Sequence, residues 1–399
     1  MNTRLPLFLR SLAVLLFLAS PVLLQAKTLN VPSAAYPTIQ SGVDAASDGD
    51  TVLVADGTYT GRGNRDIDFR GNSLTVTSQN GPTKTIIDCG GYDTTDGSGN
   101  HRGFYLHTGE RAATINGFTV KSGCEKYISG RSKGMGGGIN DSNDGSSNNT
   151  FTNCVVSGNT SEFGGGISID NRGKGKNTII NCTVSGNTAK YGGGIYIHNI
   201  DSGMVTFTSC VVSGNTAEDG GGIDNFNANE GNNKNTFTNC IISGNTAKHG
   251  GGIYNYNLDL GKGRGKNTFT NCVVSGNTAE EGGGVYIEVG TVTFTNDILY
   301  GDNGGEVIKD NKDSVMIFTT ASLAIANNCD IQDGYLGTSI INADPQFVNA
   351  SAGDFRLKPG SPCFGAGTSG GAPATDKDGT RRPKSPSIGA YEPAATSRL

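Results

Sequence analysis

Ser157-Gly-Asn-Thr-Ser-Glu-Phe-Gly-Gly-Gly-Ile167 is the stretch that decides the fold, because its pattern S-G-N-T-x-x-x-G-G-G-[IV] occurs five times. The copies begin at Ser157, Ser185, Ser213, Ser243 and Ser275, and a sixth Gly-Gly-Gly-Ile begins at Gly136. A repeat of about 28 to 32 residues is typical of a solenoid, in which each repeat forms one coil that cannot bury its apolar side alone. The sequence therefore predicts a stack of coils.

A strand-like stretch precedes each copy, as in Phe151-Thr-Asn-Cys-Val-Val156. Thr, Val, Ile and Phe favour strands, and the interruptions by Asn and Gly indicate short strands that meet at bends. Alternation of faces predicts an inward aliphatic column, with the preceding residue, such as Thr183, pointing outward. The members of this column are Val156, Val184, Val212, Ile242, Val274 and Leu299.

Cysteine recurs once per coil, two residues before the aliphatic column, at Cys154, Cys182, Cys210, Cys240 and Cys272. In-register parallel neighbours hold Cβ atoms about 4.8 Å apart, which exceeds the roughly 3.5–4.5 Å of a disulfide. We therefore expect buried thiols that pack as small apolar groups, with Cys329 as one more member. Pairing among Cys89, Cys124, Cys329 and Cys363 stays open.

Asparagine forms a second column inside the repeat, at Asn159, Asn187, Asn215, Asn245 and Asn277. Asn tolerates left-handed backbone at a bend, and stacked amides can hydrogen-bond from one coil to the next. We expect both properties at these positions. The triple Gly predicts a tight turn where the backbone crowds the neighbouring coil.

Composition narrows the class of protein. The 399 residues include 62 Gly at fixed repeat positions, which indicates an ordered array, and the net charge of −5 gives no case for nucleic acid. Residues 1–26 have the pattern of a signal peptide, with Arg4 and Arg10 before the apolar run 12–18 and Ala26 at the cleavage position. No later apolar run reaches membrane length. We expect an exported monomer without a transmembrane segment, either secreted or at a bacterial cell surface.

The block from Tyr36 to Tyr59 begins Tyr-Pro-Thr-Ile-Gln and ends Asp-Gly-Thr-Tyr. It resembles the opening cap of right-handed parallel β-helix proteins of the pectin-lyase-like superfamily. The repeats are distantly similar to those of chlamydial polymorphic outer-membrane proteins, with Gly-Gly-Gly-Ile in place of Gly-Gly-Ala-Ile. The tail from Ala343-Asp-Pro-Gln-Phe-Val to Ile388-Gly-Ala-Tyr-Glu392 resembles a choice-of-anchor Q region.

These resemblances imply an all-β fold, a right-handed parallel β-helix with a short N-terminal capping helix. They also suggest the organisation of the chain. We expect a signal peptide over 1–26, an N-terminal cap and first coil over 27–60, and the β-helix over 61–342 with its repeats at 136–300. A C-terminal cap and tail is expected over 343–399.

Length variation falls between each G-G-G-I and the next strand, so insertions gather along one edge of the solenoid, where repeat proteins often bind ligands. Cations in or beside these loops are Arg172, Lys174, Lys176, Lys234, Lys262, Arg264 and Lys266. Outward aromatic residues precede the loops, namely Tyr196, Tyr254, Tyr256 and Tyr286, with Phe226 beside them. Cations next to exposed rings fit an anionic polysaccharide or a cell-surface glycan. The alternative is a charged surface that only keeps the loops soluble.

Acidic residues on the same face are Asp141, Asp170, Asp201, Asp224 and Glu288. Asp170 and His198 share one repeat position on adjacent coils, so they can lie about 5 Å apart as an acid–base pair. They are the catalytic candidates, and a chance surface pair is the alternative. No cofactor or metal site is predicted, although the Asp141–Asp144 segment suits either Ca²⁺ or a plain turn.

Three functions remain compatible with the sequence. It favours non-catalytic glycan binding or adhesion, as an adhesin-like carbohydrate-binding protein. The alternatives are a polysaccharide lyase or glycoside hydrolase that acts on acidic polysaccharide, and a purely structural envelope protein. Fold resemblance contributes as much to this ranking as any residue does.

Overall fold

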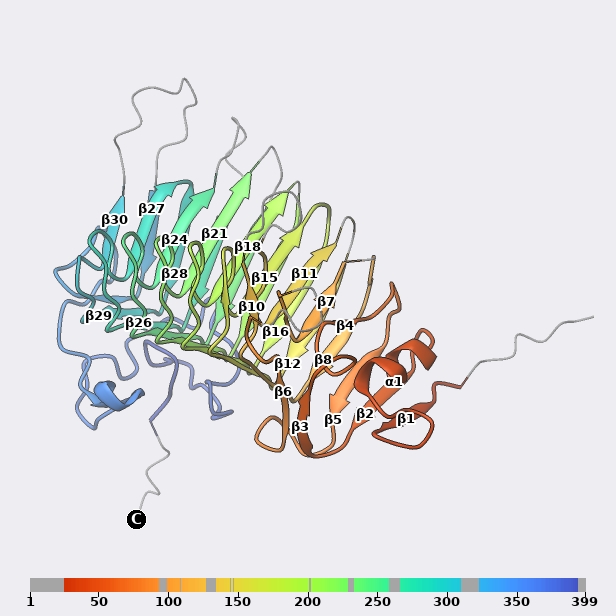
Figure 1. Cartoon of the computed structure of the whole chain (residues 1–399). Helices are drawn as coiled ribbons and strands as arrows, with labels where there is room; N and C mark the ends of the chain where they lie inside the picture. The colour runs from red at the N-terminus through yellow and green to blue at the C-terminus, as the bar shows by residue number, and fades with distance from the viewer. Residues whose placement is uncertain are drawn as a thin grey trace, which may run out of the picture.

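The structure is a computed structural model, and it describes residues 25–92, 99–107, 109–126, 134–143, 145, 147–200, 202–228, 233–257, 266–309 and 323–393. Within these residues the chain winds through three long parallel sheets that share one interior. Figure 1 shows the coils stacked side by side, from the capped red end to the blue end. This architecture is the parallel β-helix that the sequence predicts.

Sheet A contributes one strand per coil along the whole stack. Its strands, in order, are β1 (Thr28–Val31), β2 (Thr51–Val54), β5 (Thr75–Ser78), β8 (Thr114–Asn116), β12 (Thr150–Thr152), β16 (Lys176–Ile180), β19 (Met204–Thr208), β22 (Lys234–Thr238), β25 (Lys266–Thr270), β28 (Thr291–Thr295), β31 (Leu323–Asn327) and β33 (Gly337–Thr338).

Sheet B follows sheet A around each coil of the repeat region. Its strands are β3 (Gly57–Thr60), β6 (Thr85–Asp88), β9 (Thr119–Lys121), β13 (Val155–Ser157), β17 (Thr183–Ser185), β20 (Val211–Ser213), β23 (Ile241–Ser243), β26 (Val273–Ser275), β29 (Ile298–Tyr300) and β32 (Asp330–Ile331).

Sheet C follows the Gly-Gly-Gly turn. It runs through β4 (Ile67–Asp68), β7 (Phe104–Leu106), β11 (Ile139–Asn143), β15 (Ile167–Asn171), β18 (Ile195–Ile200), β21 (Ile223–Ala228), β24 (Ile253–Asn257), β27 (Val285–Val289) and β30 (Val307–Lys309). Two small sheets pair β10 (Cys124–Glu125) with β14 (Thr160–Ser161), and β34 (Phe347–Asn349) with β35 (Asp354–Leu357). A 3-10 turn, η1 (Ala350–Ala352), connects the last two strands.

The N-terminal end is closed by a short helix, α1 (Ile39–Ala45), as expected. The Thr38 hydroxyl accepts a hydrogen bond from the Ser41 N–H, and the Ser41 hydroxyl accepts one from the Thr38 N–H, so the first turn is capped from both sides. The helix buries Ile39 and Val43 against the first coil. A first coil without this helix would leave its apolar end in water.

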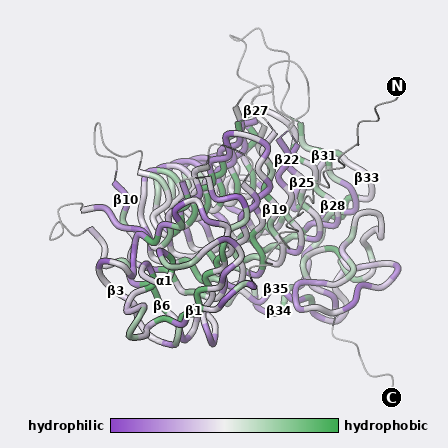
Figure 2. Tube along the Cα trace, turned by 90° about the vertical axis from the view of Figure 1, so that its right-hand side faces the viewer, coloured by the Kyte–Doolittle hydropathy of each residue, from purple (hydrophilic) through white to green (hydrophobic). Residues whose placement is uncertain are grey.

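The interior is built from stacked columns of like side chains. The predicted aliphatic column is 0–2% exposed, and Phe207, Phe237 and Phe269 stack with centroids 4.7 and 4.4 Å apart. All nine cysteines are free and buried, which confirms the buried thiol column. Figure 2 shows hydrophobic stretches running through the stack and hydrophilic stretches on many of its loops.

The strand-like stretch of each repeat is not one strand, which corrects the simple alternation of faces. Asn153 has φ 53° and turns the chain between β12 and β13. The corners of the following coils, such as Asn181 and Asn239, are also left-handed. This bend lets Phe151 and Cys154 both point inward although they are three residues apart.

The Asn159 column lies inside the coil, and its members are not the left-handed residues that the sequence suggested. The amide ladder itself is confirmed. Nδ2 of Asn187 donates to Oδ1 of Asn215 at 3.0 Å, and Nδ2 of Asn215 donates to Oδ1 of Asn245 at 2.9 Å. The left-handed residue next to the ladder is the preceding glycine, such as Gly214 at φ 62°.

The triple Gly turn is as crowded as predicted. A Cβ on Gly193 would lie 2.5 Å from the carbonyl oxygens of Gly221 and Thr216. Only glycine fits such a backbone approach, so this turn fixes how closely successive coils stack.

A threonine column follows the outer face of sheet A. Parallel pairing places one threonine of each strand opposite the next over ten successive strands, from β1 to β28. Its members are Thr28, Thr51, Thr75, Thr114, Thr150, Thr178, Thr206, Thr236, Thr268 and Thr293. None of these side chains is buried, so the column faces outward.

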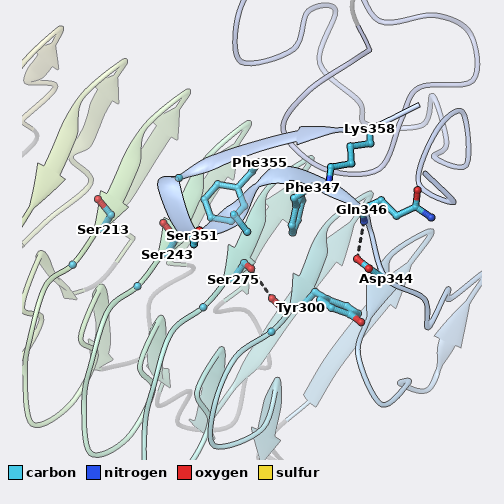
Figure 3. A pocket seen from close by; sticks show the side chains of 16 residues that line it. Ser213, Ser243, Ser275, Tyr300, Asp344, Gln346, Phe347, Ser351, Phe355 and Lys358 are labelled. Carbon is cyan, nitrogen blue, oxygen red and sulfur yellow. Dashed lines mark hydrogen bonds between the residues drawn. The ribbon is translucent and has the colours of Figure 1, made fainter. Parts of the chain in front are cut away.

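Residues 343–392, here called the C-terminal clasp, pack against the outer face of sheet B. Ile241, Val273 and Ile298 point out of the solenoid, as alternation predicts, but they are 0–2% exposed because Phe355 and Ile388 of the clasp cover them. Between the hairpin β34–β35 and the serines of β20, β23 and β26 the clasp leaves a hollow of about 920 Å³ (Figure 3).

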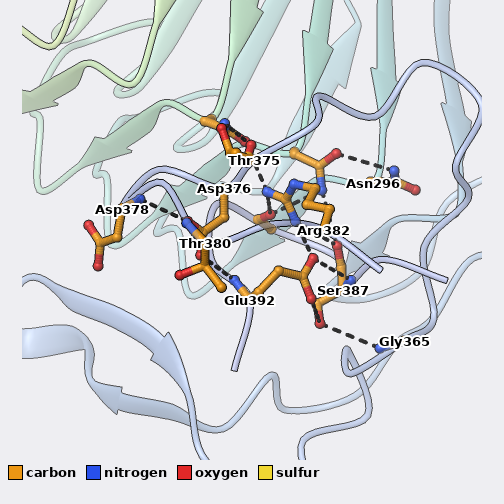
Figure 4. A network of polar contacts seen from close by, with 12 residues as sticks. Asn296, Gly365, Thr375, Asp376, Asp378, Thr380, Arg382, Ser387 and Glu392 are labelled. Carbon is orange, nitrogen blue, oxygen red and sulfur yellow. Dashed lines mark hydrogen bonds and ion pairs between the residues drawn. The ribbon is translucent and has the colours of Figure 1, made fainter. Parts of the chain in front are cut away.

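A buried polar network fastens the clasp to the coils (Figure 4). Arg382 pairs with Glu392 at 2.5 Å, and its Nη2 donates to the corner residue Asn239 at 2.9 Å. Lys377 donates to the carbonyl oxygen of Ser209 at 3.0 Å, and Asn271 donates to that of Ser387 at 3.0 Å. The left-handed corners thus serve as docking points for the clasp.

Candidate functional site

The outer face of sheet C carries ionisable and aromatic groups in register on successive strands. In each of these strands the residue equivalent to Ile167 and the residue two positions later point inward. The residues that alternate with them form two outward columns. The first column runs through Ser168, Tyr196, Asp224, Tyr254 and Tyr286, and the second through Asp170, His198, Phe226 and Tyr256.

Asp170 and His198 meet as the sequence predicts. They are register partners on β15 and β18, and Nδ1 of His198 lies 3.0 Å from Oδ1 of Asp170. Arg172 approaches the other carboxylate oxygen with Nε at 3.1 Å and Nη2 at 3.0 Å. The Asp170 carboxylate is thus shared between two basic side chains.

These three side chains line a pocket of about 460 Å³ together with Met135, Glu162, Phe163 and Tyr196. Oε2 of Glu162 is shielded from solvent and has no hydrogen-bond partner among the described residues. The pocket therefore combines an apolar wall with acidic oxygens that can accept hydrogen bonds from a ligand.

The charge state of Asp170 is set by its neighbours. Burial alone would raise its pKa, but the hydrogen bonds and positive charges of His198 and Arg172 outweigh burial and hold the pKa below its ordinary value. Asp170 is therefore a carboxylate at neutral pH. It orients the His198 ring through Nδ1, which leaves Nε2 as the nitrogen that can exchange a proton with a ligand.

An aromatic row leads away from this pocket along the second column. The ring of His198 lies 5.4 Å from that of Phe226, and Phe226 stacks on Tyr256 at 4.9 Å with 5° between the ring planes. Phe226 and Tyr256 are partly exposed. The row crosses three coils along the stack, with the His198 ring tilted by 50° to that of Phe226 and the rings of Phe226 and Tyr256 parallel.

Two of the predicted outward tyrosines are not on the surface. Tyr196 is 7% exposed and Tyr286 is 5% exposed, because side chains from the turns, Phe163 and His249, pack against their rings. Tyr254 is partly exposed, and its hydroxyl donates a short hydrogen bond to Glu288. The expectation of four exposed tyrosines was therefore wrong for Tyr196 and Tyr286.

The other predicted acidic residues lie in different environments. Asp141 points into the coil, where both of its oxygens accept hydrogen bonds from Asn149 at 3.1 and 3.2 Å, so it does not lie on the candidate face. Asp224 is on the face but is buried, and burial raises its pKa well above the ordinary value, with Asp219 and Glu288 adding to the effect. Asp144 and Asp201 lie outside the described residues.

The predicted basic stripe does not lie beside the aromatic row. Lys176, Lys234 and Lys266 are exposed and in register, with Met204 between the first two, but they stand at the start of sheet A strands. Arg172 and Lys174 are exposed at the loop between the two sheets, while Lys262 and Arg264 lie outside the described residues. The loop edge thus separates the cations of sheet A from the rings of sheet C.

Sequence reasoning missed the wall of the pocket. Phe163 and its coil neighbours Tyr191, Asp219 and His249 form bridges from coil to coil. They occupy the last variable position before each Gly-Gly-Gly, where aromatic and ionisable residues predominate. That enrichment was the signal in the sequence that could have identified the pocket wall. Among the described residues no three His, Cys, Asp or Glu side chains gather as a metal site, and no helix is long and apolar enough to cross a bilayer.

Comparison with known proteins identifies the fold. No family model and no curated protein matches the chain. Its structure is similar to that of a pectate lyase, Pel9A, with a TM-score of 0.57 and 18% identity over 92% of this chain and 96% of the other. At that identity the likeness establishes the fold alone, and the chain is a right-handed parallel β-helix of the kind found in pectate lyase.

Two further solved structures align with lower scores. A pectin methylesterase from Aspergillus niger matches with a TM-score of 0.42 and 16% identity, over 80% of this chain and 91% of the other. A galactohydrolase of a sulfated galactose polymer matches with a TM-score of 0.43 and 15% identity, over 71% of this chain and 74% of the other.

Proposed function

We propose that this chain is an exported β-helix protein, secreted or at a cell surface, that binds a polysaccharide on the outer face of sheet C without cleaving it. The observation that carries the proposal is the aromatic row formed by His198, Phe226 and Tyr256. Partly exposed aromatic rings in line can contact successive sugar rings, and the adjoining pocket supplies hydrogen-bonding groups at one end.

Charge favours an acidic polysaccharide as the ligand. Arg172 follows β15 directly and lines the pocket, and exposed Lys174 stands two residues further along the same loop. A guanidinium or ammonium group there can pair with carboxylates or sulfates of a sugar chain. The pectate lyase that shares the fold is named for pectate, so pectate heads the list of ligands to test.

The test is affinity electrophoresis of the purified protein in gels that contain pectate, a sulfated galactan or a neutral glucan. We expect Phe226→Ala and Tyr256→Ala each to weaken binding by about tenfold, since loss of one stacked ring costs about 0.5–1.5 kcal/mol beyond its buried area. Lys174→Glu should weaken binding to the two acidic polymers alone. Tyr92→Ala removes a half-exposed tyrosine outside sheet C and is the matched control.

Unchanged mobility of both aromatic variants relative to the parent would refute the proposal. A parent protein that is retarded by none of the polymers would do the same, and it would favour a purely structural role.

A second function, cleavage of the polysaccharide, is favoured by the Asp170–His198 hydrogen bond inside the pocket. A histidine oriented by a carboxylate can exchange a proton with a substrate, and Glu162 would offer a second carboxyl group. Product analysis separates the two functions. New reducing or unsaturated ends that vanish in His198→Gln would establish cleavage, whereas binding without product supports the binding protein.

A further inference from the structure

The outer face of sheet A repeats one residue type with unusual regularity. The threonine column occupies ten successive strands without an exception. Two residues further along the strands a second column is mostly threonine, with Leu53, Asn116 and Ile180 among the exceptions. Its threonines are Thr77, Thr152, Thr208, Thr238, Thr270 and Thr295. Apart from Thr270, which is 8% exposed, the side chains of both columns are accessible to solvent.

Strand propensity alone does not explain this repetition. Val, Ile and Tyr suit a strand surface as well as Thr does. The outward column two residues further along the same strands shows the variation that propensity permits, with Asn116, Thr152 and Ile180 in register. The first threonine column is therefore held to one side chain more strictly than its neighbour.

The threonine array repeats in register from coil to coil. Beneath the threonines of sheet A the rings of Phe207, Phe237 and Phe269 stack with 5° and 4° between their planes, and Phe269 and Phe294 stack with 24°. Each threonine also has a restricted χ1, because its side chain branches at Cβ. The methyl and hydroxyl groups consequently form a regular grid, and the exposed side chains of Lys176, Lys234 and Lys266 stand two residues before it on the same strands.

The grid has two spacings. Successive coils are about 4.8 Å apart, and residues two apart along a strand are about 6.6 Å apart. These intervals are close to the two repeats of oxygen atoms on a prism plane of hexagonal ice. Hydroxyl groups can take positions in such a lattice as hydrogen-bonding partners of water, and the methyl groups between them favour ordered water over bulk water.

We propose that the threonine face of sheet A binds crystalline water, the prism face of ice. The surface suits a periodic lattice, because its threonines repeat at regular spacings and do not form a pocket for a single molecule. It is a different face from that proposed for polysaccharide, so the two activities can be lost separately.

The experiment measures incorporation of the folded protein into a slowly growing ice hemisphere, together with inhibition of ice recrystallisation. We expect the parent to enter the ice, and we expect Thr206→Tyr with Thr236→Tyr to lower incorporation by about tenfold or more, because two bulky rings break the match to the lattice. Tyrosine is a good strand former, so the double variant should keep the parent's circular dichroism and melting temperature.

Thr183→Tyr places the same ring on sheet B and should be incorporated like the parent. Exclusion of the parent from ice would overturn the proposal. Equal incorporation of the double variant and the parent would also overturn it, and so would binding of the parent to microcrystalline cellulose in place of ice. Pectate binding should be unchanged in the double variant, so failure of this proposal is distinguishable from failure of the polysaccharide proposal.

Discussion

At the scale of single residues, buried amides hold neighbouring coils in register. Asn215 donates to the carbonyl oxygen of Val184 at 3.0 Å and to Asn245 at 2.9 Å, while its own oxygen accepts from Asn187. Each amide therefore joins three successive coils. A side chain with all its hydrogen bonds satisfied in the interior stabilises the fold and also excludes a slipped stack.

Replacing one such amide tests this role. We expect Asn215→Leu to lower the free energy of unfolding by about 1–3 kcal/mol, because the Asn187 and Asn245 amides and the Val184 carbonyl lose buried partners. Urea unfolding followed by circular dichroism measures the change. Asn148→Leu alters an exposed asparagine and should be nearly neutral. A melting temperature for Asn215→Leu at or above that of the parent contradicts the ladder.

Asp297 stands in the cysteine column, between Cys272 and Cys329. Burial raises its pKa to about 8, although hydrogen bonds from the N–H groups of Cys272 and Thr295 oppose the shift. The folded chain therefore holds this acid in its neutral form. Since the folded pKa exceeds the unfolded value of about 3.9, the associated stability is complete at low pH and is lost as the pH rises through about 8.

We expect the free energy of unfolding to fall between about pH 4 and about pH 8, with a contribution from Asp297 of at most about 1.4 kcal/mol per pH unit. Asp302 and Glu306 also titrate in or near this range, with pKa values raised by burial to about 6 and about 9. The informative quantity is therefore the difference between the parent and Asp297→Asn. That difference should change with pH, and a constant difference would show that Asp297 does not titrate there.

At the scale of elements, the repeat spacing was sufficient to predict the coils, because each column must stack like on like. The corner at Asn153 was hidden, since Asn suits both a strand end and a left-handed bend and only the packing of Phe151 and Cys154 distinguishes them. A second set of buried amides was also missed. It includes Asn171 and Asn199, whose amides bond at 2.8 Å, although their common repeat position was a signal.

The candidate site was predictable only where two residues share a repeat position. Asp170 and His198 do, and they meet. Phe163 and Glu162 belong to the turn before the triple Gly, and their approach to Asp170 depends on how that turn folds back over sheet C. Burial of Tyr196 has the same cause. The pocket wall and the burial of Tyr196 cannot be predicted from alternation along a strand. Alternation predicts the face of the sheet on which a residue lies, but not the side chains that cover that face.

The clasp is the element whose attachment is easiest to test. Glu392→Gln leaves the buried Arg382 guanidinium without its counter-charge, and we expect a loss of about 3–5 kcal/mol. Asp354→Asn breaks the partly exposed pair with Arg356 and should cost about 1 kcal/mol or less. Thermal unfolding of the two variants measures the contrast. Equal melting temperatures would mean that the Arg382–Glu392 pair does not secure the clasp.

At the scale of the whole molecule, one interior supports three unlike faces. Sheet C presents rings and ionisable groups, sheet A presents threonine, and sheet B is partly covered by the clasp. Since each coil of the repeat region contributes a strand to each sheet, one repeated motif sets the spacing on all three faces at once. A β-helix can therefore change one face by substitution of outward residues without disturbing the stack.

The clasp also has a consequence for how the chain is made. Coils pair with their sequence neighbours, so they can stack in order as they emerge during synthesis. Lys377, however, reaches back 168 residues to Ser209, and Arg382 reaches back 143 residues to Asn239. Until those residues arrive, Ile241, Val273 and Ile298 face water on a nascent chain. During that interval these three apolar side chains form a surface that a chaperone would bind.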